Sequence, residues 1–208
     1  MKVVNPKKLL IFDLDGVIFD SKKNMEIAWN QTSKKFDLNI SFNNYFKKIG
    51  MPFMEILKSL DVEPRIEIYE CFKNTSLENI HLIKPYKNVT KMLNKLRKNK
   101  VKFSIVTSKD FKRTKFLLKK SGIEPNSIHC PNKKLRGKPY PDHLLHSIKT
   151  NNVEPLDSCF FGDSKIDYLA AKNANIDFVF VSYGYGKESN EYKQQIEDFN
   201  QVNKFIGI

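Results

Sequence analysis

The sequence contains little cysteine, little arginine and no long hydrophobic segment. Its three cysteines are far apart and form no C-x-x-C pair. An odd number of cysteines without a pairing pattern is typical of a reducing compartment, so we expect a cytoplasmic protein without disulfide bonds. No uncharged apolar run reaches the length of about 18 residues that a membrane-spanning helix needs, so we expect no contact with a membrane interior.

Basic residues outnumber acidic residues by 36 to 23, which gives a formal net charge of +13. Such an excess occurs in proteins that bind nucleic acid or membranes. However, only four of the basic residues are arginine, the residue type that reads bases and binds phosphate in a bidentate manner, and the lysines are scattered along the chain. We therefore do not expect nucleic acid as a partner, and we expect the positive field to favour small anionic molecules.

Short apolar runs alternate with helical patterns over most of the 208 residues. The runs lack period-two alternation, as is typical of strands buried on both faces of a sheet. They lie at residues 8–12, 102–107, 127–130, 158–162 and 178–181. Helical patterns lie at residues 88–99, 111–121, 139–150 and 164–173, and a short last helix is expected at 201–206. This order predicts an α/β fold, namely a Rossmann-like doubly wound parallel sheet with helices on both faces.

Residues 17–84 break this alternation. They contain no convincing strand, and three amphipathic helices are expected there. These helices lie at 24–36, 52–60 and 64–74. A stretch of this length is too long for a loop in a compact domain, so we expect an inserted helical domain at 17–84 and a core domain formed by 1–16 and 85–208. Trp29 would lie in the core of the inserted domain or face a bound molecule.

Two aspartates, Asp13 and Asp15, follow the first apolar run and are themselves followed by Gly16. One carboxylate there can attack an electrophile while the other holds and releases a proton. An aspartate-rich turn explains the same residues about equally well. A calcium-binding loop is excluded, because its sixth and twelfth positions would be Ile18 and Asn24 in place of Gly and Glu.

Two further segments could bind an anion. The second predicted core strand ends at the hydroxyl residues Thr107 and Ser108. A hydroxyl and backbone N–H groups there suit phosphate oxygens, although Ser108 could simply cap the next helix. Lys138 precedes a proline-started helix, which would hold its ammonium group in place to offset the negative charge of a carboxylate and a phosphoryl group. Taken alone, an ordinary surface lysine is the simpler interpretation.

A third segment could bind a metal ion. Asp163 ends an apolar strand and Asp167 follows one helical turn later, so both carboxylates lie on the same side of the turn. Hard oxygen ligands with little His or Cys nearby indicate magnesium. Asp163 or Ser164 could instead cap the helix. His143 and His146 have no third ligand near them in the sequence, so we expect them to pack against neighbouring elements or face solvent.

The four segments occur in order at predicted strand ends, which meet at one edge of a parallel sheet. Together they make the chain similar to hydrolases of the haloacid dehalogenase superfamily, over residues 8–186. The motifs of that family are D-x-D-G, a strand-ending Thr or Ser, a Lys followed by P-x-P-D, and G-D-S-x-x-D. In this chain they lie at 13–16, 107, 138–142 and 162–167. The inserted helices resemble the family's cap domain, and residues 15–21 most resemble the phosphoglycolate phosphatase and beta-phosphoglucomutase branch.

The resemblance implies a Mg²⁺-dependent phosphatase that hydrolyses a small phosphorylated metabolite. Asp13 would attack phosphorus and form an aspartyl-phosphate. Asp15 would protonate the leaving oxygen and then deprotonate the hydrolytic water. Thr107, Ser108 and Lys138 would hold the phosphoryl oxygens.

The same resemblance implies a magnesium site. The Asp13 carboxylate, the Asp15 backbone carbonyl and Asp163 would be ligands, and Asp167 would act through water or hydrogen bonds. With Mg²⁺ and Lys138 beside it, the carboxyl of Asp13 should have a low pKa.

By the same resemblance, a loop with Lys48, Gly50 and Met51 would set the substrate. Mutase relatives carry an Arg shortly after this Gly, and its absence favours hydrolysis over a sugar-phosphate mutase of the beta-phosphoglucomutase kind. Dehalogenases proper lack the acid that corresponds to Asp15, so we do not expect dehalogenation. Asn175 replaces a family glycine without an expected loss of function, because Asn tolerates left-handed backbone.

Several questions stay open at the level of the sequence. The substrate could be phosphoglycolate, a sugar phosphate, a nucleotide or pyrophosphate. The protein could be a monomer or a homodimer. The alternative from another class is a catalytically inactive binding module on the same fold.

Overall fold

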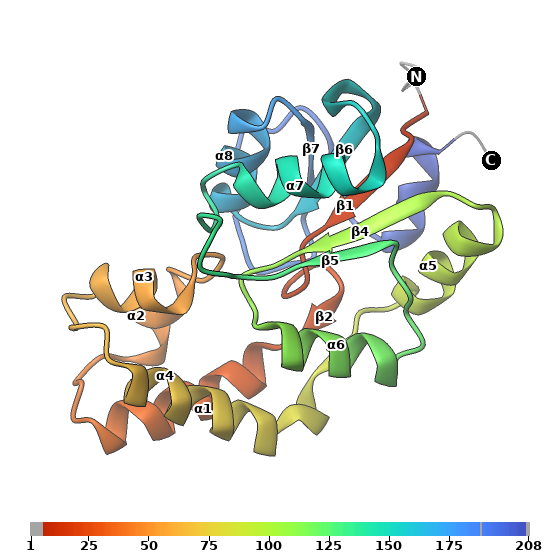
Figure 1. Ribbon diagram of the computed structural model, residues 1–208. Coiled ribbons are helices and arrows are strands. Elements are labelled where there is room, and N and C mark those ends of the chain that lie inside the picture. Colours follow the sequence, from red (N-terminus) through yellow and green to blue (C-terminus); the bar gives the residue numbers. More distant parts are fainter. Residues whose placement is uncertain (1–5, 188, 207–208) are drawn as a thin grey trace.

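The computed structural model describes residues 6–187 and 189–206. Its central feature is a six-stranded sheet in the order β5-β4-β1-β6-β7-β8, in which every neighbouring pair of strands is parallel (Figure 1). The strands are β1 (Leu9–Phe12), β4 (Lys102–Val106), β5 (Ser127–His129), β6 (Ser158–Gly162), β7 (Asp177–Val181) and β8 (Gln195–Ile196). The predicted α/β class is confirmed, and among the six strands of this sheet only the short edge strand β8 was not expected.

Helices cover both faces of the sheet because side chains along each strand alternate between the faces. From β1, Leu10 and Phe12 join the apolar cluster under α5, α6 and the 3-10 helix η3, whereas Leu9 and Ile11 join the cluster under α7 and α8. Figure 1 shows these two groups of helices on opposite sides of the sheet. The elements are α5 (Val89–Lys98), α6 (Phe111–Lys120), α7 (Asp142–Asn151), η2 (Pro155–Asp157), α8 (Lys165–Asn173) and η3 (Phe199–Phe205).

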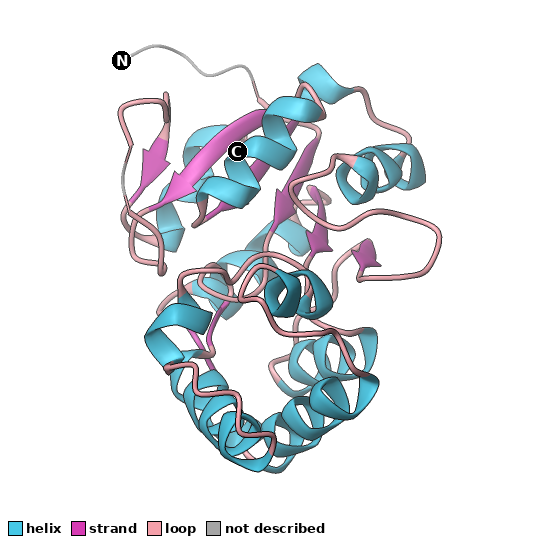
Figure 2. Ribbon diagram, turned by 90° about the vertical axis from the view of Figure 1, so that its left-hand side faces the viewer, coloured by secondary structure: helices cyan, strands magenta, loops and turns pink. Residues whose placement is uncertain are grey.

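A separate group of helices follows β1 in the sequence and does not cover the sheet faces. We refer to these helices as the cap helices. They are α1 (Lys22–Lys35), α2 (Phe42–Phe46), α3 (Phe53–Lys58) and α4 (Ile66–Glu78). Figure 2 shows them gathered below the sheet. They enclose an apolar core of their own, in which Trp29 is fully buried and stacks on Tyr45 with 4.3 Å between the ring centroids. Of the two positions expected for Trp29, the structure shows the one in this core.

A two-stranded antiparallel ribbon joins the cap helices to the sheet. It consists of β2 (Phe19–Asp20) and β3 (Lys84–Pro85), and the 3-10 helix η1 (Ile80–Leu82) precedes β3. The expectation that residues 17–84 contain no strand is therefore wrong at their two ends. Strands of two residues are too short to produce a hydrophobic pattern, which is why the sequence did not reveal them.

Several helices differ from the expectation. In the cap, the short helix α2 was not expected, and α4 extends to Glu78 where an end at residue 74 was expected. The helix expected at 139–150 begins at Asp142, because Pro141 occupies its N-cap position. The last helix, expected at 201–206, is a 3-10 helix at Phe199–Phe205. Within residues 6–187 and 189–206, no helix combines the length and the apolar character needed to cross a bilayer.

Candidate active site

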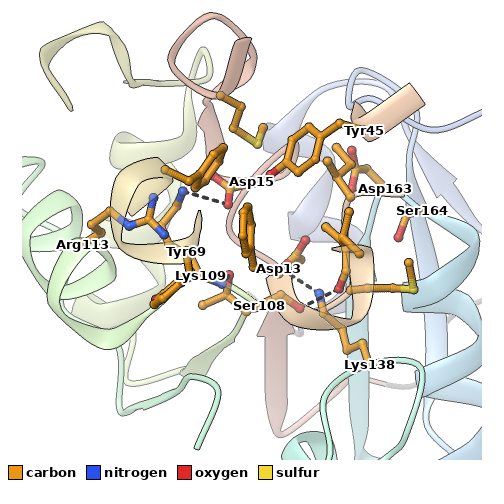
Figure 3. Close-up of a pocket in the computed structure, with 18 residues that line it drawn as sticks. Asp13, Asp15, Tyr45, Tyr69, Ser108, Lys109, Arg113, Lys138, Asp163 and Ser164 are labelled. Carbon is orange, nitrogen blue, oxygen red and sulfur yellow. Dashed lines mark hydrogen bonds and ion pairs between the residues drawn. The ribbon is translucent and has the colours of Figure 1, made fainter. Parts of the chain in front are cut away.

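The carboxyl ends of three adjacent strands bring the predicted site residues together. In the sheet, β1 lies between β4 and β6. Asp13 directly follows β1, Thr107 directly follows β4, and Asp163 directly follows β6. Lys138 reaches the same place from the loop between β5 and α7 (Figure 3). The residues meet because parallel strands end at a common edge of the sheet.

Three buried carboxylates lie beside one buried ammonium group. Oxygens of Asp13, Asp163 and Asp167 lie within 4.8 Å of one another, and no other three possible metal ligands in the described part of the chain are grouped in this way. Lys138 Nζ lies 2.9 Å from Asp13 Oδ1 and 2.6 Å from Asp167 Oδ1. One positive charge does not balance three buried negative charges, so the cluster fits a divalent cation with oxygen ligands.

The pKa values of these groups reflect their crowding. Burial, with Asp167 and Asp15 as neighbours, raises the pKa of Asp13 to about 7, although Lys138 opposes the shift. Burial, with Asp167 and Asp13 as neighbours, raises the pKa of Asp163 well above its usual value. Burial lowers the pKa of Lys138, but Asp13 and Asp167 outweigh it and raise that pKa. Lys138 alone therefore does not produce the low pKa expected for Asp13, and a cation would be needed to lower it.

Asp167 is held by hydrogen bonds on both of its oxygens. Its Oδ2 accepts from the Ser164 backbone N–H at 3.2 Å and from the Ser164 hydroxyl at 2.6 Å, while its Oδ1 accepts from Lys138. The Ser164 hydroxyl accepts in turn from the Asp167 N–H, which completes a capping box at the start of α8. Of the two capping candidates, Ser164 is the cap, and Asp163 instead accepts from the Tyr185 N–H at 2.6 Å.

Asp15 is also fixed by two donors but is more accessible. Its Oδ1 accepts from the Ser21 hydroxyl, and its Oδ2 lies 3.1 Å from Lys109 Nζ. The Asp15 side chain is 20% exposed, against 6% for Asp13. Figure 3 shows Asp13 paired with Lys138 and Asp15 paired with Lys109 across the pocket. A carboxylate that is fixed and open to the pocket is suited to giving and taking protons.

Ser108 contacts the connection between the cap helices α2 and α3 and does not cap α6. The N-cap residue of α6 is Asp110, whose side chain accepts from the Arg113 N–H at 3.0 Å. The Ser108 hydroxyl donates to the Gly50 carbonyl at 2.6 Å, so it connects the edge of the sheet to the cap. The interpretation of Ser108 as a helix cap is therefore wrong. Thr107 is buried, and its hydroxyl accepts from the Lys109 N–H at 3.1 Å.

The loop after β7 approaches Asp163 closely, which sequence reasoning missed. A Cβ on Gly184 would lie 2.3 Å from Asp163 Cβ, and a Cβ on Gly186 would lie 1.7 Å from the Asp163 carbonyl oxygen. Between these glycines, Tyr185 donates its N–H to Asp163 and accepts the Ser21 N–H on its hydroxyl at 2.6 Å. The signal was present as the Gly-Tyr-Gly sequence, since two glycines around one aromatic residue indicate a close approach of the backbone.

A pocket of about 670 Å³, including its open mouth, lies between these residues and the cap helices (Figure 3). Its cap side is mostly apolar and includes Phe53 and Phe72. Of the three residues expected to set the substrate, Gly50 and Met51 line the pocket. Lys48 is half-buried and lies outside this lining. Its role stays a prediction.

Sequence reasoning also missed Lys109 and Arg113, which line the same pocket. Their exposed fractions are only 6% and 4%. Burial lowers the pKa of Lys109, Asp15 opposes this shift, and Arg113 adds to it. The only signal was position, because Lys109 follows Thr107 and Ser108 and Arg113 follows one helical turn later. In a chain so rich in lysine, that position does not stand out.

Among residues 6–187 and 189–206, the histidines of α7 belong to no group of possible metal ligands. His143 is buried, and its two ring nitrogens have no hydrogen-bond partner. His146 is exposed, and its Nδ1 lies 3.0 Å from Nδ1 of His129. These are the packed and solvent-facing positions expected from the sequence.

Comparison with known proteins assigns the chain to a family. Residues 10–181 match the family described as haloacid dehalogenase-like hydrolase, and the chain belongs to that family. Phosphoglycolate phosphatase of Aquifex aeolicus (strain VF5) is 28% identical over 197 residues, which cover 92% of this chain and 91% of that protein. Pyrophosphatase PpaX of Oceanobacillus iheyensis is 21% identical over 208 residues, which cover 96% of this chain and 97% of that protein.

Solved structures show the same fold. The crystal structure of a hydrolase from Pseudomonas syringae is similar with a TM-score of 0.81 and 25% identity, covering 95% of this chain and 98% of that one. The family resemblance indicated by the four motifs is thereby confirmed. The comparisons place the carboxylate cluster in a fold that phosphatases share.

Proposed function

We propose that this chain is a phosphatase that uses Mg²⁺ to hydrolyse a small phosphorylated metabolite through an aspartyl-phosphate. The observation that carries the proposal is the buried pair of Asp13 and Lys138 beside two further aspartates at the edge of the sheet. Relatives named phosphoglycolate phosphatase and pyrophosphatase support it. We further propose that residues 17–84 act as a cap domain on a core of 1–16 and 85–208.

In this proposal Asp13 attacks phosphorus. Lys138 holds its carboxylate at 2.9 Å, and the same ammonium group would offset negative charge on the transferred phosphoryl group. The Thr107 hydroxyl and the Ser108 backbone N–H would bind phosphoryl oxygens, since both residues line the pocket at the end of β4. Transfer of this kind depends mainly on alignment and charge neutralisation, which these groups provide.

The residues that would hold Mg²⁺ are Asp13, the Asp15 backbone carbonyl and Asp163. The bound ion would supply the charge that lets a carboxylate approach an anionic phosphate. Asp167 would keep this arrangement in place, because its two oxygens bind Lys138 and Ser164.

Asp15 would act as acid and then as base. It would donate a proton to the leaving oxygen and later accept one from the water that hydrolyses the aspartyl-phosphate. Ser21 and Lys109 hold its two oxygens, so the carboxyl would stay oriented toward the reacting atoms in both steps. The apolar cap side of the pocket would limit access of other water during the first step.

The proposal is tested with Asp13→Asn. We expect release of inorganic phosphate from p-nitrophenyl phosphate and from a panel of phosphorylated metabolites, with MgCl₂ present, to fall roughly 1,000-fold or more. The matched control is Asp37→Asn, at an exposed position on the first cap connection with φ of 49°, which Asn accepts. The control should keep full turnover.

Three results would contradict the proposal. Retained turnover by Asp13→Asn excludes Asp13 as the nucleophile. An isomerised sugar phosphate without phosphate release identifies a mutase. Binding of phosphorylated ligands by the unmodified protein, with no product formed, identifies an inactive binding module.

A further inference from the structure

The proposed mechanism leaves two buried cations of the pocket without a direct role toward the substrate. Lys109 and Arg113 line the pocket on the side of Asp15, which we call the basic side. The ion pair of Lys109 places Nζ 3.1 Å from Asp15 Oδ2. Arg113 is anchored through its Nε to Asp110, the N-cap residue of α6. Both side chains are therefore held in place before any substrate binds.

The surroundings strengthen the electrostatic interactions of these two cations. Arg113 lies 5.8 Å from the centroid of the Phe72 ring, and Tyr45, also buried, extends from the cap toward Asp15 (Figure 3). In such an apolar, poorly hydrated environment, charges interact more strongly than in water. The two cations repel each other, and Asp15 and Asp110 are the acids that face them. In the proposed mechanism Asp15 carries a proton when it acts as the acid, so these four groups then have a net charge of +1 and an additional anion beside the two cations would be stabilised.

The basic side also lies next to the leaving group. In the proposed mechanism Asp15 hydrogen-bonds the leaving oxygen, and Lys109 contacts the same carboxylate. Two successive hydrogen bonds place Lys109 Nζ within about 6 Å of that oxygen. A substrate group one or two bonds beyond the scissile bond would therefore reach Lys109. Arg113 follows four residues later, in the first turn of α6.

We propose that Lys109 and Arg113 form a subsite for a second anionic group, located on the leaving group of the substrate. The preferred substrate is then a small phosphate ester with a carboxylate near the scissile bond, or an anhydride with a second phosphoryl group. A neutral polyol would leave both cations without an added partner, and a cationic leaving group would be repelled. This inference rests on the proposed phosphatase function and narrows its substrate class.

The test uses matched substrates that differ in the charge of the leaving group. They are 2-phosphoglycolate and pyrophosphate as anionic substrates, ethyl phosphate as the neutral one, and phosphoethanolamine as the cationic one. We expect kcat/KM of the unmodified protein to be roughly 10- to 100-fold higher for at least one anionic substrate than for ethyl phosphate, and lowest for phosphoethanolamine. The two anionic substrates distinguish a carboxylate from a phosphoryl group as the natural occupant.

Variants then assign the preference to the two residues. Lys109→Met and Arg113→Gln should each reduce the ratio of anionic to neutral kcat/KM by roughly tenfold or more. Comparing ratios between variants cancels the different intrinsic reactivities of the esters. The matched control is Lys112→Met, an exposed lysine on the same helix, which should leave the ratio unchanged. The comparison of the four substrates uses the unmodified protein, so it remains a test of the subsite even if one variant does not fold.

The outcomes separate the subsite from the proposed function. Hydrolysis of all four compounds at similar rates overturns the subsite and leaves the phosphatase intact. An equal loss on anionic and neutral esters in Lys109→Met also overturns it, because Lys109 would then act only by positioning Asp15. If the protein hydrolyses neither these four compounds nor any other phosphate ester, the proposed phosphatase function is refuted, and the subsite with it.

Discussion

The two sides of the pocket differ in charge and in origin. The acidic side contains Asp13, Asp163 and Asp167 around a single lysine, and its residues follow β1 and β6 or sit in the first turn of α8. The basic side contains Lys109 and Arg113, which belong to the connection after β4 and the first turn of α6. One side therefore suits a cation and the other an anion. We infer that the acidic side performs the chemistry and that the basic side selects the substrate.

Two lysine variants test this division between the sides, and they should give its largest effect. Lys138→Met should lower kcat/KM roughly 100- to 1,000-fold for every phosphate ester, because it removes the cationic side chain that contacts both Asp13 and Asp167. Lys109→Met should instead lower kcat/KM mainly for esters with an anionic leaving group. Steady-state kinetics on the same substrate panel measures both effects.

The division into an acidic and a basic side is contradicted if Lys138→Met and Lys109→Met lower kcat/KM by the same factor for every ester. Thermal unfolding serves as the control, since Lys138→Met leaves buried carboxylates without their cation and should lower the free energy of unfolding by about 3 kcal/mol. A folded Lys138→Met protein with normal turnover would remove Lys138 from the mechanism. Chelation with EDTA followed by Mg²⁺ addition shows whether activity still depends on the ion.

The two sides also differ in how well the sequence predicted them. Asp13 and Asp163 each end a fully buried apolar strand, and a strand end in a parallel sheet has a known position relative to its neighbours. Their meeting point could therefore be predicted without coordinates. Lys109 and Arg113 lie just beyond such an end, where the direction of a side chain depends on loop and helix geometry that no pattern specifies.

The fold shows the same limit. The core strands were predicted from short apolar runs and the long helices from helical patterns, whereas β2, β3 and β8 have only two residues each. Their pairing is determined by the tertiary structure around them. The contact from the Ser108 hydroxyl to the Gly50 carbonyl, which connects core and cap, was equally invisible, because it joins residues that are 58 positions apart.

A smaller effect concerns the acidic side alone and appears in the pH dependence of stability. Burial raises the pKa of Asp13 to about 7 and raises that of Asp163, whereas in the unfolded chain an aspartate has a pKa near 3.8. The folded state therefore holds these protons more tightly. This contribution to stability is present at low pH and is lost as the pH rises from about 4 to about 7.

The measurement is the free energy of unfolding against pH in EDTA. Asp163→Asn should remove one of these groups, so the free energy of unfolding should change less between pH 4 and pH 7 than in the unmodified protein. The contributions of other titrating groups to the pH dependence cancel when the variant is compared with the unmodified protein. Mg²⁺ should stabilise the unmodified protein more at pH 7 than at pH 5, because the ion binds the ionised carboxylates. Identical pH curves for the two proteins would contradict the raised pKa.

The smallest effect concerns Tyr185, which connects the two sides. Its backbone N–H binds Asp163 on the acidic side, and its hydroxyl accepts from the N–H of Ser21, whose own hydroxyl holds Asp15 on the basic side. Tyr185→Phe keeps the backbone contact but removes all contacts of the hydroxyl, which also lies 3.1 Å from Asp20 Oδ1 and 3.4 Å from the Phe19 carbonyl oxygen. It should cost about 1 kcal/mol of unfolding free energy and lower turnover several-fold. Mg²⁺ affinity should not change, since the backbone contact remains, and Tyr140→Phe at an exposed tyrosine provides the control. A weakened Mg²⁺ affinity in Tyr185→Phe would mean that the acidic side depends on the hydroxyl contact as well, and that the two sides are not separable.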